Sequence, residues 1–155
     1  MQGSAWLVPS IAVSATAPMA AASPVKTCPV SPPVLGYGEL VVPSGPCVGA
    51  PLTGAFTFTI MSTQSTYTVV VLRVETQSYV ASGWTAWTSV TSATWTPTAP
   101  TVVAPGANIA GTGSVPSFSQ PLAHHFRVFY SLLSDGFPEG GCEYHLNLAI
   151  NPPCP

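Results

Sequence analysis

Four cysteines are the residues with the most definite chemistry in this 155-residue sequence: Cys28, Cys47, Cys142 and Cys154. Zinc sites need closely spaced thiolates such as Cys-x-x-Cys, and no such spacing occurs here. Disulfide bonds are therefore the expected use, and four cysteines allow three pairings. Local pairing gives Cys28–Cys47 and Cys142–Cys154, each of which would tie down a proline-rich end of the chain. Bonds between chains and free buried thiols are the alternatives.

Acid–base residues are few, and their spacing gives little indication of catalysis. If the strands around residues 127 and 145 pair, His125, Glu143 and His145 share one outward face, and two histidines with one carboxylate can bind iron or zinc. Polar residues on the solvent side of a strand are the ordinary explanation, so we expect no metal ion and no cofactor. Asp135 and Glu139 share a solvent-exposed turn. The chain also lacks a Gly-x-Ser-x-Gly motif and a phosphate-binding glycine loop, so we predict that the protein is not an enzyme.

Three tryptophans, Trp84, Trp87 and Trp95, lie in one segment of strand-like composition. In an extended chain Trp84 points to the side opposite Trp87 and Trp95, so at least one indole is expected at the surface or in a contact. Exposed indoles suit sugar rings, and Trp is also enriched at protein interfaces. The segment offers no Asp, Asn or Glu for sugar hydroxyls. We therefore expect all three to contact partner subunits, with glycan binding as the alternative.

A long β-hairpin is the clearest element that the sequence predicts. Residues 124–133 and 142–150 alternate apolar and polar side chains, which is the period of a half-buried strand. Between them, Asp135-Gly136, Pro138 and Gly140-Gly141 favour a reversal of direction. The side chains expected to be buried together are Phe126, Val128, Tyr130, Tyr144, Leu146 and Leu148 of the hairpin, with Phe56 and Phe58.

Other segments have strand character, and none has a helical period. Residues 56–60 alternate apolar residues with threonine, and residues 67–75 are apolar on both sides, as in a central or interface-facing strand. Residues 98–113 contain Pro100, Pro105-Gly106 and Gly111-Thr112-Gly113, which favour short edge strands and turns. Together these patterns predict an all-β fold: a single β-sandwich or barrel, immunoglobulin-like or jelly-roll-like.

Residues 1–53 are interrupted by proline every few residues, which disfavours both helix and central strand. We therefore expect a long, extended, proline-rich N-terminal arm over residues 1–53 and a β-sandwich domain over residues 54–155. Residues 1–25 are uncharged, but prolines interrupt them as a membrane span. A poor signal peptide is the alternative, with residues 17–23 as a small-residue cleavage region, but the basic region of such peptides is lacking, so we expect Met1 to be retained. The arm residues expected to contact a partner are Trp6, Leu7, Val8, Ile11 and Val13.

The composition is unusual because only 5% of the residues are charged, against about 25% in an average soluble domain. Three basic residues cannot form a phosphate-binding patch, which excludes nucleic-acid binding. Disorder is disfavoured because 46% of the residues are hydrophobic and the net charge is only −2. No Asn-x-Ser/Thr sequon is present, so N-glycans do not account for solubility. Threonine, serine, glycine and proline must cover the surface instead.

These properties favour a non-enzymatic structural protein of an assembled particle. The expected setting is a virion, with the chain as a decoration, cement or fibre protein that binds and stabilises neighbouring capsid or tail subunits or copies of itself. The alternatives are an extracellular fibre subunit or adhesin with an immunoglobulin-like fold, and a carbohydrate-binding module. We expect the protein on a virion or extracellular surface, where disulfides persist.

Overall fold

The computed structural model describes residues 26–41, 52–118 and 124–151, and every regular element within them is a β-strand. The all-β prediction is therefore confirmed. The strands are β1 (Val34–Val41), β2 (Leu52–Ser62), β3 (Tyr67–Val80), β4 (Gly83–Trp84), β5 (Thr88–Ser89), β6 (Thr94–Thr96), β7 (Thr101–Val103), β8 (Asn108–Phe118), β9 (His124–Leu133) and β10 (Cys142–Asn151).

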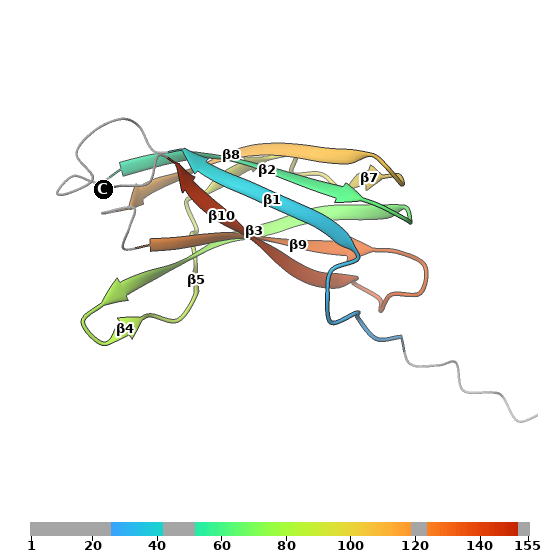
Figure 1. The fold of residues 1–155 in the computed structure, drawn as a ribbon, viewed down its shortest axis with the longest axis horizontal. Helices are drawn as coiled ribbons and strands as arrows, with labels where there is room; N and C mark the ends of the chain where they lie inside the picture. The colour runs from blue at the N-terminus through green and yellow to red at the C-terminus, as the bar shows by residue number, and fades with distance from the viewer. Residues whose placement is uncertain (1–25, 42–51, 119–123, 152–155) are drawn as a thin grey trace, which may run out of the picture.

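The strands form one sheet that folds over into two packed layers. One layer contains β1, β2, β8 and β6, and the other contains β3, β9 and β10, with β4, β5 and β7 along the outer edge of β3. Figure 1 shows β8, β2 and β1 lying over β10, β9 and β3. The strand β1 joins the layers because it pairs with β2 along its whole length and runs parallel to β10 at Gly38–Val41.

This strand order distinguishes the two topologies that the sequence left open. If the main strands β1, β2, β3, β6, β8, β9 and β10 are lettered A to G, one layer reads A–B–E–D and the other C–F–G. That is the arrangement of immunoglobulin-like sandwiches. The structure is therefore an immunoglobulin-like β-sandwich rather than a jelly roll.

The predicted hairpin is confirmed as β9 and β10, which pair with Phe126 opposite Leu148 and Val128 opposite Leu146. Gly140 and Gly141 lie in its turn with φ of 92° and 81°, a conformation that glycine adopts without steric cost. All the side chains predicted to be buried together are in one core: Phe126, Val128, Tyr130, Tyr144, Leu146, Leu148, Phe56 and Phe58. The alternating pattern therefore located the core face of the hairpin and of β2.

The strand β1 shows that the β domain begins before residue 54. Residues 34–41 lie between Pro33 and Pro43, in an interval that contains no proline. Leu40 of this strand is fully buried between the layers. The segment belongs to the sheet and not to an extended arm, contrary to the predicted boundary. Residues 1–25 and 42–51 lie outside the described residues, so the remaining arm stays a prediction.

The strand β3 changes phase in its middle. Tyr67, Val69 and Val71 are buried, and the sequence pattern places Val74 on the opposite side. A shift of register between Val71 and Arg73 turns Val74 into the core as well. The extra residue, Leu72, is a β-bulge, which leaves one residue unpaired and increases the local twist. The apolar composition of residues 67–75 suggested a strand buried on both sides. The structure instead buries one side before the bulge and the alternate residues after it.

The glycines of β8 have a packing role that the sequence pattern did not predict. Gly111 and Gly113 were expected to mark turns, but both lie inside a strand of 11 residues. A methyl group on Gly111 would lie 2.1 Å from Cζ of Phe58, and one on Gly113 would lie 2.2 Å from Cζ of Phe56. Glycine is needed at both positions because the ring of Phe58 lies where a side chain at Gly111 would be, and the ring of Phe56 does the same at Gly113.

We predict that Gly111→Ala lowers the free energy of unfolding by about 1–3 kcal/mol, the usual cost of overpacking a core. The added methyl group would also approach the Thr96 carbonyl oxygen to 2.6 Å, and backbone gives way less easily than a side chain. Urea unfolding measures the change. Thr112→Ala is the control because Thr112 is exposed on the same strand, and equal midpoints for the two variants would contradict the packing role.

Candidate functional site

The first of two candidate surfaces is the outer side of the β1–β2–β8–β6 layer, called here the neutral face. Its side chains point away from the core and occupy every second position of each strand. The strand registers align them in rows across the layer. They are Leu35, Tyr37, Glu39 and Val41 of β1; Ala55, Thr57, Thr59 and Met61 of β2; Asn108, Ala110, Thr112 and Ser114 of β8; and Thr94 and Thr96 of β6.

The neutral face is poor in charge and has exposed apolar side chains along one edge. Glu39 is its one charged residue among those described. Leu35 and Tyr37 are 60% and 65% exposed, and Val41 is exposed further along the same strand. Apolar side chains gathered in this way on a monomer indicate a contact surface when they are rimmed by polar residues. Here the rest of the face supplies hydroxyl and amide groups.

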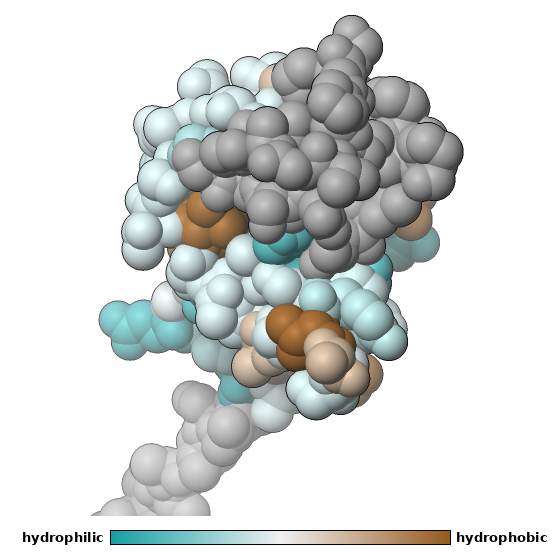
Figure 2. Space-filling view, turned by 90° about the vertical axis from the view of Figure 1, so that its left-hand side faces the viewer, coloured by the Kyte–Doolittle hydropathy of each residue, from teal (hydrophilic) through white to brown (hydrophobic). Residues whose placement is uncertain are grey.

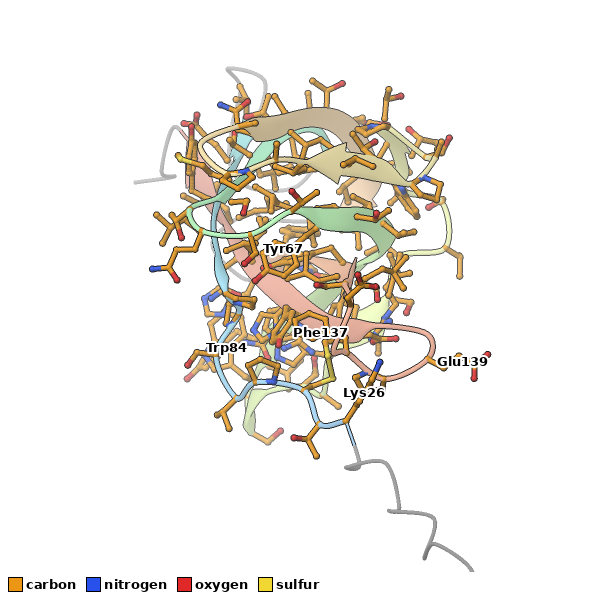
Figure 3. All side chains as sticks on the ribbon, turned by 90° about the vertical axis from the view of Figure 1, so that its right-hand side faces the viewer. Lys26, Tyr67, Trp84, Phe137 and Glu139 are labelled. Atoms are coloured by element: carbon orange, nitrogen blue, oxygen red, sulfur yellow. A yellow bond between two sulfur atoms is a disulfide. The ribbon has the colours of Figure 1, made fainter. Side chains whose placement is uncertain are left out.

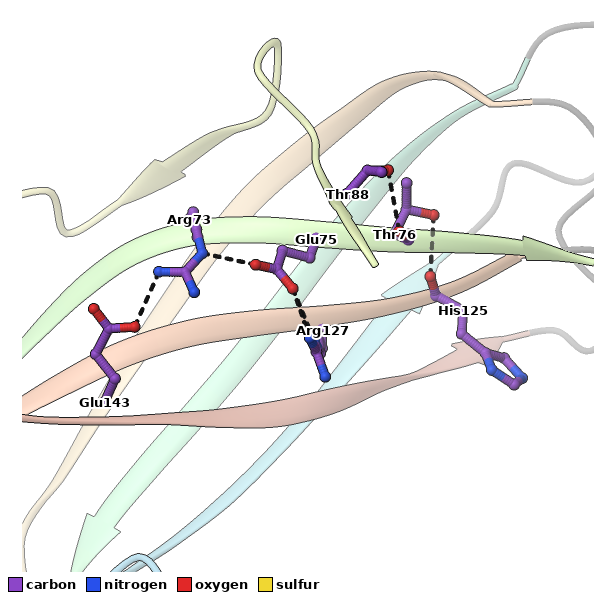
Figure 4. A network of polar contacts seen from close by, with 7 residues as sticks. All are labelled: Arg73, Glu75, Thr76, Thr88, His125, Arg127 and Glu143. Atoms are coloured by element: carbon purple, nitrogen blue, oxygen red, sulfur yellow. Dashed lines mark hydrogen bonds and ion pairs between the residues drawn. The ribbon is translucent and has the colours of Figure 1, made fainter. Parts of the chain in front are cut away.

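The second surface is the outer side of β3, β9 and β10, called here the polar–aromatic face. It holds both arginines of the chain and two of its five acidic residues. Arg73 Nε donates to Glu75 Oε1 over 2.7 Å, and Arg127 Nη2 donates to Glu75 Oε2 over 2.7 Å. Arg73 Nη1 also donates to Glu143 Oε2 over 3.1 Å, which completes the chain of ion pairs in Figure 4.

Aromatic rings cover this ion-pair network. The guanidinium of Arg73 lies 3.9 Å from the ring centre of Phe129, and that of Arg127 lies 3.9 Å from the ring centre of Trp87. The Glu75 side chain is only 10% exposed. Burial raises the pKa of the Glu75 carboxyl, but hydrogen bonds from Arg73 and Arg127 outweigh burial and hold the pKa below its ordinary value. The network therefore stabilises the ionised carboxylate.

We predict that Glu75→Gln lowers the free energy of unfolding by about 1.5–3 kcal/mol at pH 7, because it removes charge-assisted hydrogen bonds. The pKa of Glu75 is lower in the folded state than its ordinary 4.5, so the folded protein gains stability above that pH and loses it as pH falls through the folded value. The difference in unfolding free energy between the wild type and the variant should therefore shrink below about pH 4.5.

Chemical denaturation from pH 7 to pH 3 checks this expectation. Glu139→Gln is the matched control because Glu139 is exposed in the hairpin turn, and it should follow the wild-type profile. If Glu75→Gln lowered the free energy of unfolding by the same amount from pH 7 to pH 3, the proposed stabilisation of the carboxylate would be contradicted.

The three tryptophans predicted as partner contacts lie in different surroundings. Trp95 packs against the core, and its Nε1 is buried without a hydrogen-bond partner among the described residues. Trp87 is half-buried over Arg127. Trp84 is 43% exposed beside Tyr79 and Val80 at the β3–β4 turn. Figure 2, which faces this side of the molecule, shows separate brown apolar patches among pale and teal residues. The expectation of at least one exposed indole is confirmed, and partner contact stays a prediction.

Both predicted disulfide pairings are wrong, because Cys28 is bonded to Cys142 across a sequence separation of 114 residues. The bond ties the segment before β1 to the first residue of β10. Tyr144 Oη also donates to the Pro29 carbonyl oxygen over 3.0 Å, so this proline-rich segment runs along the edge of β10. Cys47 and Cys154 lie outside the described residues, and their use in a disulfide stays a prediction.

The histidines do not form the metal set considered from the sequence. His145 lies opposite Phe129, whereas His125 lies opposite Gln77 toward the other end of the same face. Within the described ranges, no group of three or more His, Cys, Asp or Glu could hold a metal ion. Burial, and after it the nearby positive charge of Arg127, lower the pKa of the His145 imidazole below its ordinary value.

The hairpin turn forms a shallow hollow of about 610 Å³. Phe137 stacks on Tyr67 with ring centres 5.9 Å apart, and Figure 3 places Lys26 and Glu139 at the rim. Asp135 and Glu139 are both exposed here. The turn therefore holds its carboxylates in solvent, and the stacked rings anchor it to β3.

The remaining predicted contacts, Trp6, Leu7, Val8, Ile11 and Val13, lie outside the described residues. No helix in the part of the chain that the structure describes is long and apolar enough to cross a membrane.

Comparisons with known proteins give no family. No protein-family model and no curated protein matches the chain. A solved structural-genomics target, SoR45, is similar over 77% of this chain and 86% of its own, with 13% identity and a TM-score of 0.42. The ASH/PapD-like domain 7 of human CEP192 is similar over 92% of this chain and 97% of its own, with 12% identity and a TM-score of 0.35. The fold assignment therefore rests on the strand order alone.

Proposed function

We propose that this chain is a non-enzymatic structural protein that binds neighbouring protein subunits of an assembled particle through the neutral face. A virion is the proposed setting, with the chain as a decoration, cement or fibre protein of the capsid or tail. The observation that carries the proposal is the combination of exposed Leu35 and Tyr37 with a surrounding surface that is nearly free of charge.

The physical basis is the cost of removing water from the contact. A charged side chain loses much free energy when it is buried without a partner, whereas hydroxyl and methyl groups lose little. A face of Thr, Ser and Ala can therefore be covered by another subunit without requiring matched ions. Tyrosine is among the residues that most often dominate binding energy at interfaces, and Tyr37 is the exposed tyrosine of this face.

The disulfide bond supports a site of action outside a reducing cytosol, since such bonds persist in secreted proteins and on virion surfaces. It also favours a second candidate, an extracellular fibre subunit or adhesin. That candidate shares the immunoglobulin-like sandwich and the dependence on subunit contacts. The two differ in the particle to which the chain belongs.

Fractionation of the native source tests the proposed function. The chain should sediment with a large particle and be present at a fixed ratio to its major subunit, measured by quantitative mass spectrometry. A cell-surface fibre in that fraction would favour the second candidate. Sedimentation as a free 15.9 kDa monomer in every fraction would overturn both.

A further inference from the structure

A hollow of about 350 Å³ lies on the polar–aromatic face beside Trp87, and we call it the Trp87 hollow. Residues of three strands and of the segment between β4 and β5 line it: Gln77, Trp87, His125, Phe126, Asn147 and Leu148. Its volume is within the range of about 300–1,000 Å³ that is typical of small-molecule sites. No carboxylate, ammonium or guanidinium group is among these lining residues, so the hollow suits an uncharged ligand.

The polar groups of the hollow are held in fixed positions by the sheet. Gln77 and His125 are opposite each other in the pairing of β3 and β9. Gln77 Nε2 and His125 Nδ1 are 2.9 Å apart in a hydrogen bond, which leaves Gln77 Oε1 and His125 Nε2 for a ligand. Asn147 is exposed beside them on β10. Its amide offers donors and an acceptor together, as hydroxyl recognition requires.

One indole, Trp87, lines the hollow, and a second, Trp84, supports a lining residue from outside. The Arg127 guanidinium covers one face of the Trp87 ring at 3.9 Å from its centre, and Trp87 is only half-buried. Trp84 stacks on His125 with ring centres 3.7 Å apart and an interplanar angle of 19°, which fixes the imidazole. An immobile aromatic surface next to a few oriented polar groups is the usual composition of a specific ligand site.

We propose that the Trp87 hollow binds one unit of a neutral saccharide. A pyranose ring has an apolar side of C–H groups, which would pack on the Trp87 indole, and hydroxyl groups, which would bond to Gln77, His125 and Asn147. The sequence argued against a sugar site because the tryptophan segment supplies no polar partner. The structure supplies these partners from β3, β9 and β10. The site lies on the layer opposite the neutral face, so it is independent of the proposed subunit contact.

Nuclear magnetic resonance titration of the full chain tests the proposal. The probes are glucose, galactose, mannose and N-acetylglucosamine with their common disaccharides, and sialic acid and a sulfated disaccharide serve as charged comparators. We expect at least one neutral saccharide to bind with Kd of about 1 mM or lower and to shift the Trp87 indole signal. Asn147→Ala should weaken that binding at least about ten-fold.

Asn108→Ala is the matched control, because Asn108 is an exposed asparagine on β8 of the other layer, and it should bind like the wild type. Asn147→Ala changes an exposed side chain, so loss of binding would not be due to unfolding. The proposal is overturned if no neutral saccharide binds at about 10 mM, if only the charged comparators bind, or if Asn147→Ala binds unchanged.

Discussion

Removing the Cys28–Cys142 bond with the double variant Cys28→Ala/Cys142→Ala should lower the free energy of unfolding by about 2–5 kcal/mol. The bond closes a loop of more than one hundred residues, given a sequence separation of 114, and a cross-link of that length restricts the unfolded chain strongly. It also fixes the proline-rich segment, which has few backbone pairing partners of its own. Urea unfolding without reductant measures the change.

Val30→Ala is the control for this variant, since Val30 is fully exposed in the same segment and should leave the unfolding midpoint unchanged. Non-reducing peptide mapping of the wild type should recover the Cys28 peptide joined to the Cys142 peptide. With those two cysteines bonded, any further intramolecular bond must join Cys47 to Cys154. Recovery of Cys28 joined to Cys47 would contradict the structure.

Leu146→Ala should cost about 2–5 kcal/mol of unfolding free energy, because it leaves a cavity in a close-packed core. Leu146 is 5% exposed, and it packs opposite Val128 between the layers. Its neighbour His145 points outward and is the natural control, so His145→Ala should change the free energy far less. Equal losses in the two variants would mean that β10 is buried on both sides.

The alternation of side chains was sufficient to predict the core of β2, β9 and β10. Each of these strands has one buried and one exposed side, so the period of two in the sequence corresponds directly to the structure. The turn chemistry of Asp135-Gly136 and Gly140-Gly141 then set the hairpin. Local patterns of this kind need no knowledge of the rest of the chain.

Features that depend on distant residues could not be predicted in the same way. Cys28 meets Cys142 only because β1 lies beside β10, and nothing local to either cysteine indicates this. The bulge at Leu72 reverses the phase of β3 without a proline or glycine as a signal. Gly111 looks like a turn residue until the position of Phe58 is known. The proline-free interval between Pro33 and Pro43 is a local signal for the strand β1, but the predicted arm included it.

The candidate surfaces were predictable only in part. The low charge of the chain predicts surfaces with few ions, and the outer side of β1, β2, β8 and β6 has Glu39 as its one charged residue among those described. The ion-pair network, in which Arg73 and Glu75 lie on β3 and their partner Arg127 comes from β9, was not predicted from the sequence. The grouping of Gln77 and Asn147 around Trp87 also needed the strand register.

The most direct test of the proposed subunit contact is the occupancy of a charged variant in the native particle. Leu35→Lys/Tyr37→Lys would add two ammonium groups to a face on which Glu39 is the one charged residue among those described, and burying charge that lacks a matched partner costs much free energy. The loss of an interface tyrosine alone commonly costs a factor of ten or more in affinity. Val102→Lys is the matched control, since Val102 is 66% exposed on β7, away from the neutral face.

Both variants should retain the circular dichroism and melting temperature of the wild type. Copies per particle should fall at least about ten-fold for Leu35→Lys/Tyr37→Lys and stay at the wild-type number for Val102→Lys. Equal occupancy of the two folded variants would contradict the claim that the neutral face binds neighbouring subunits.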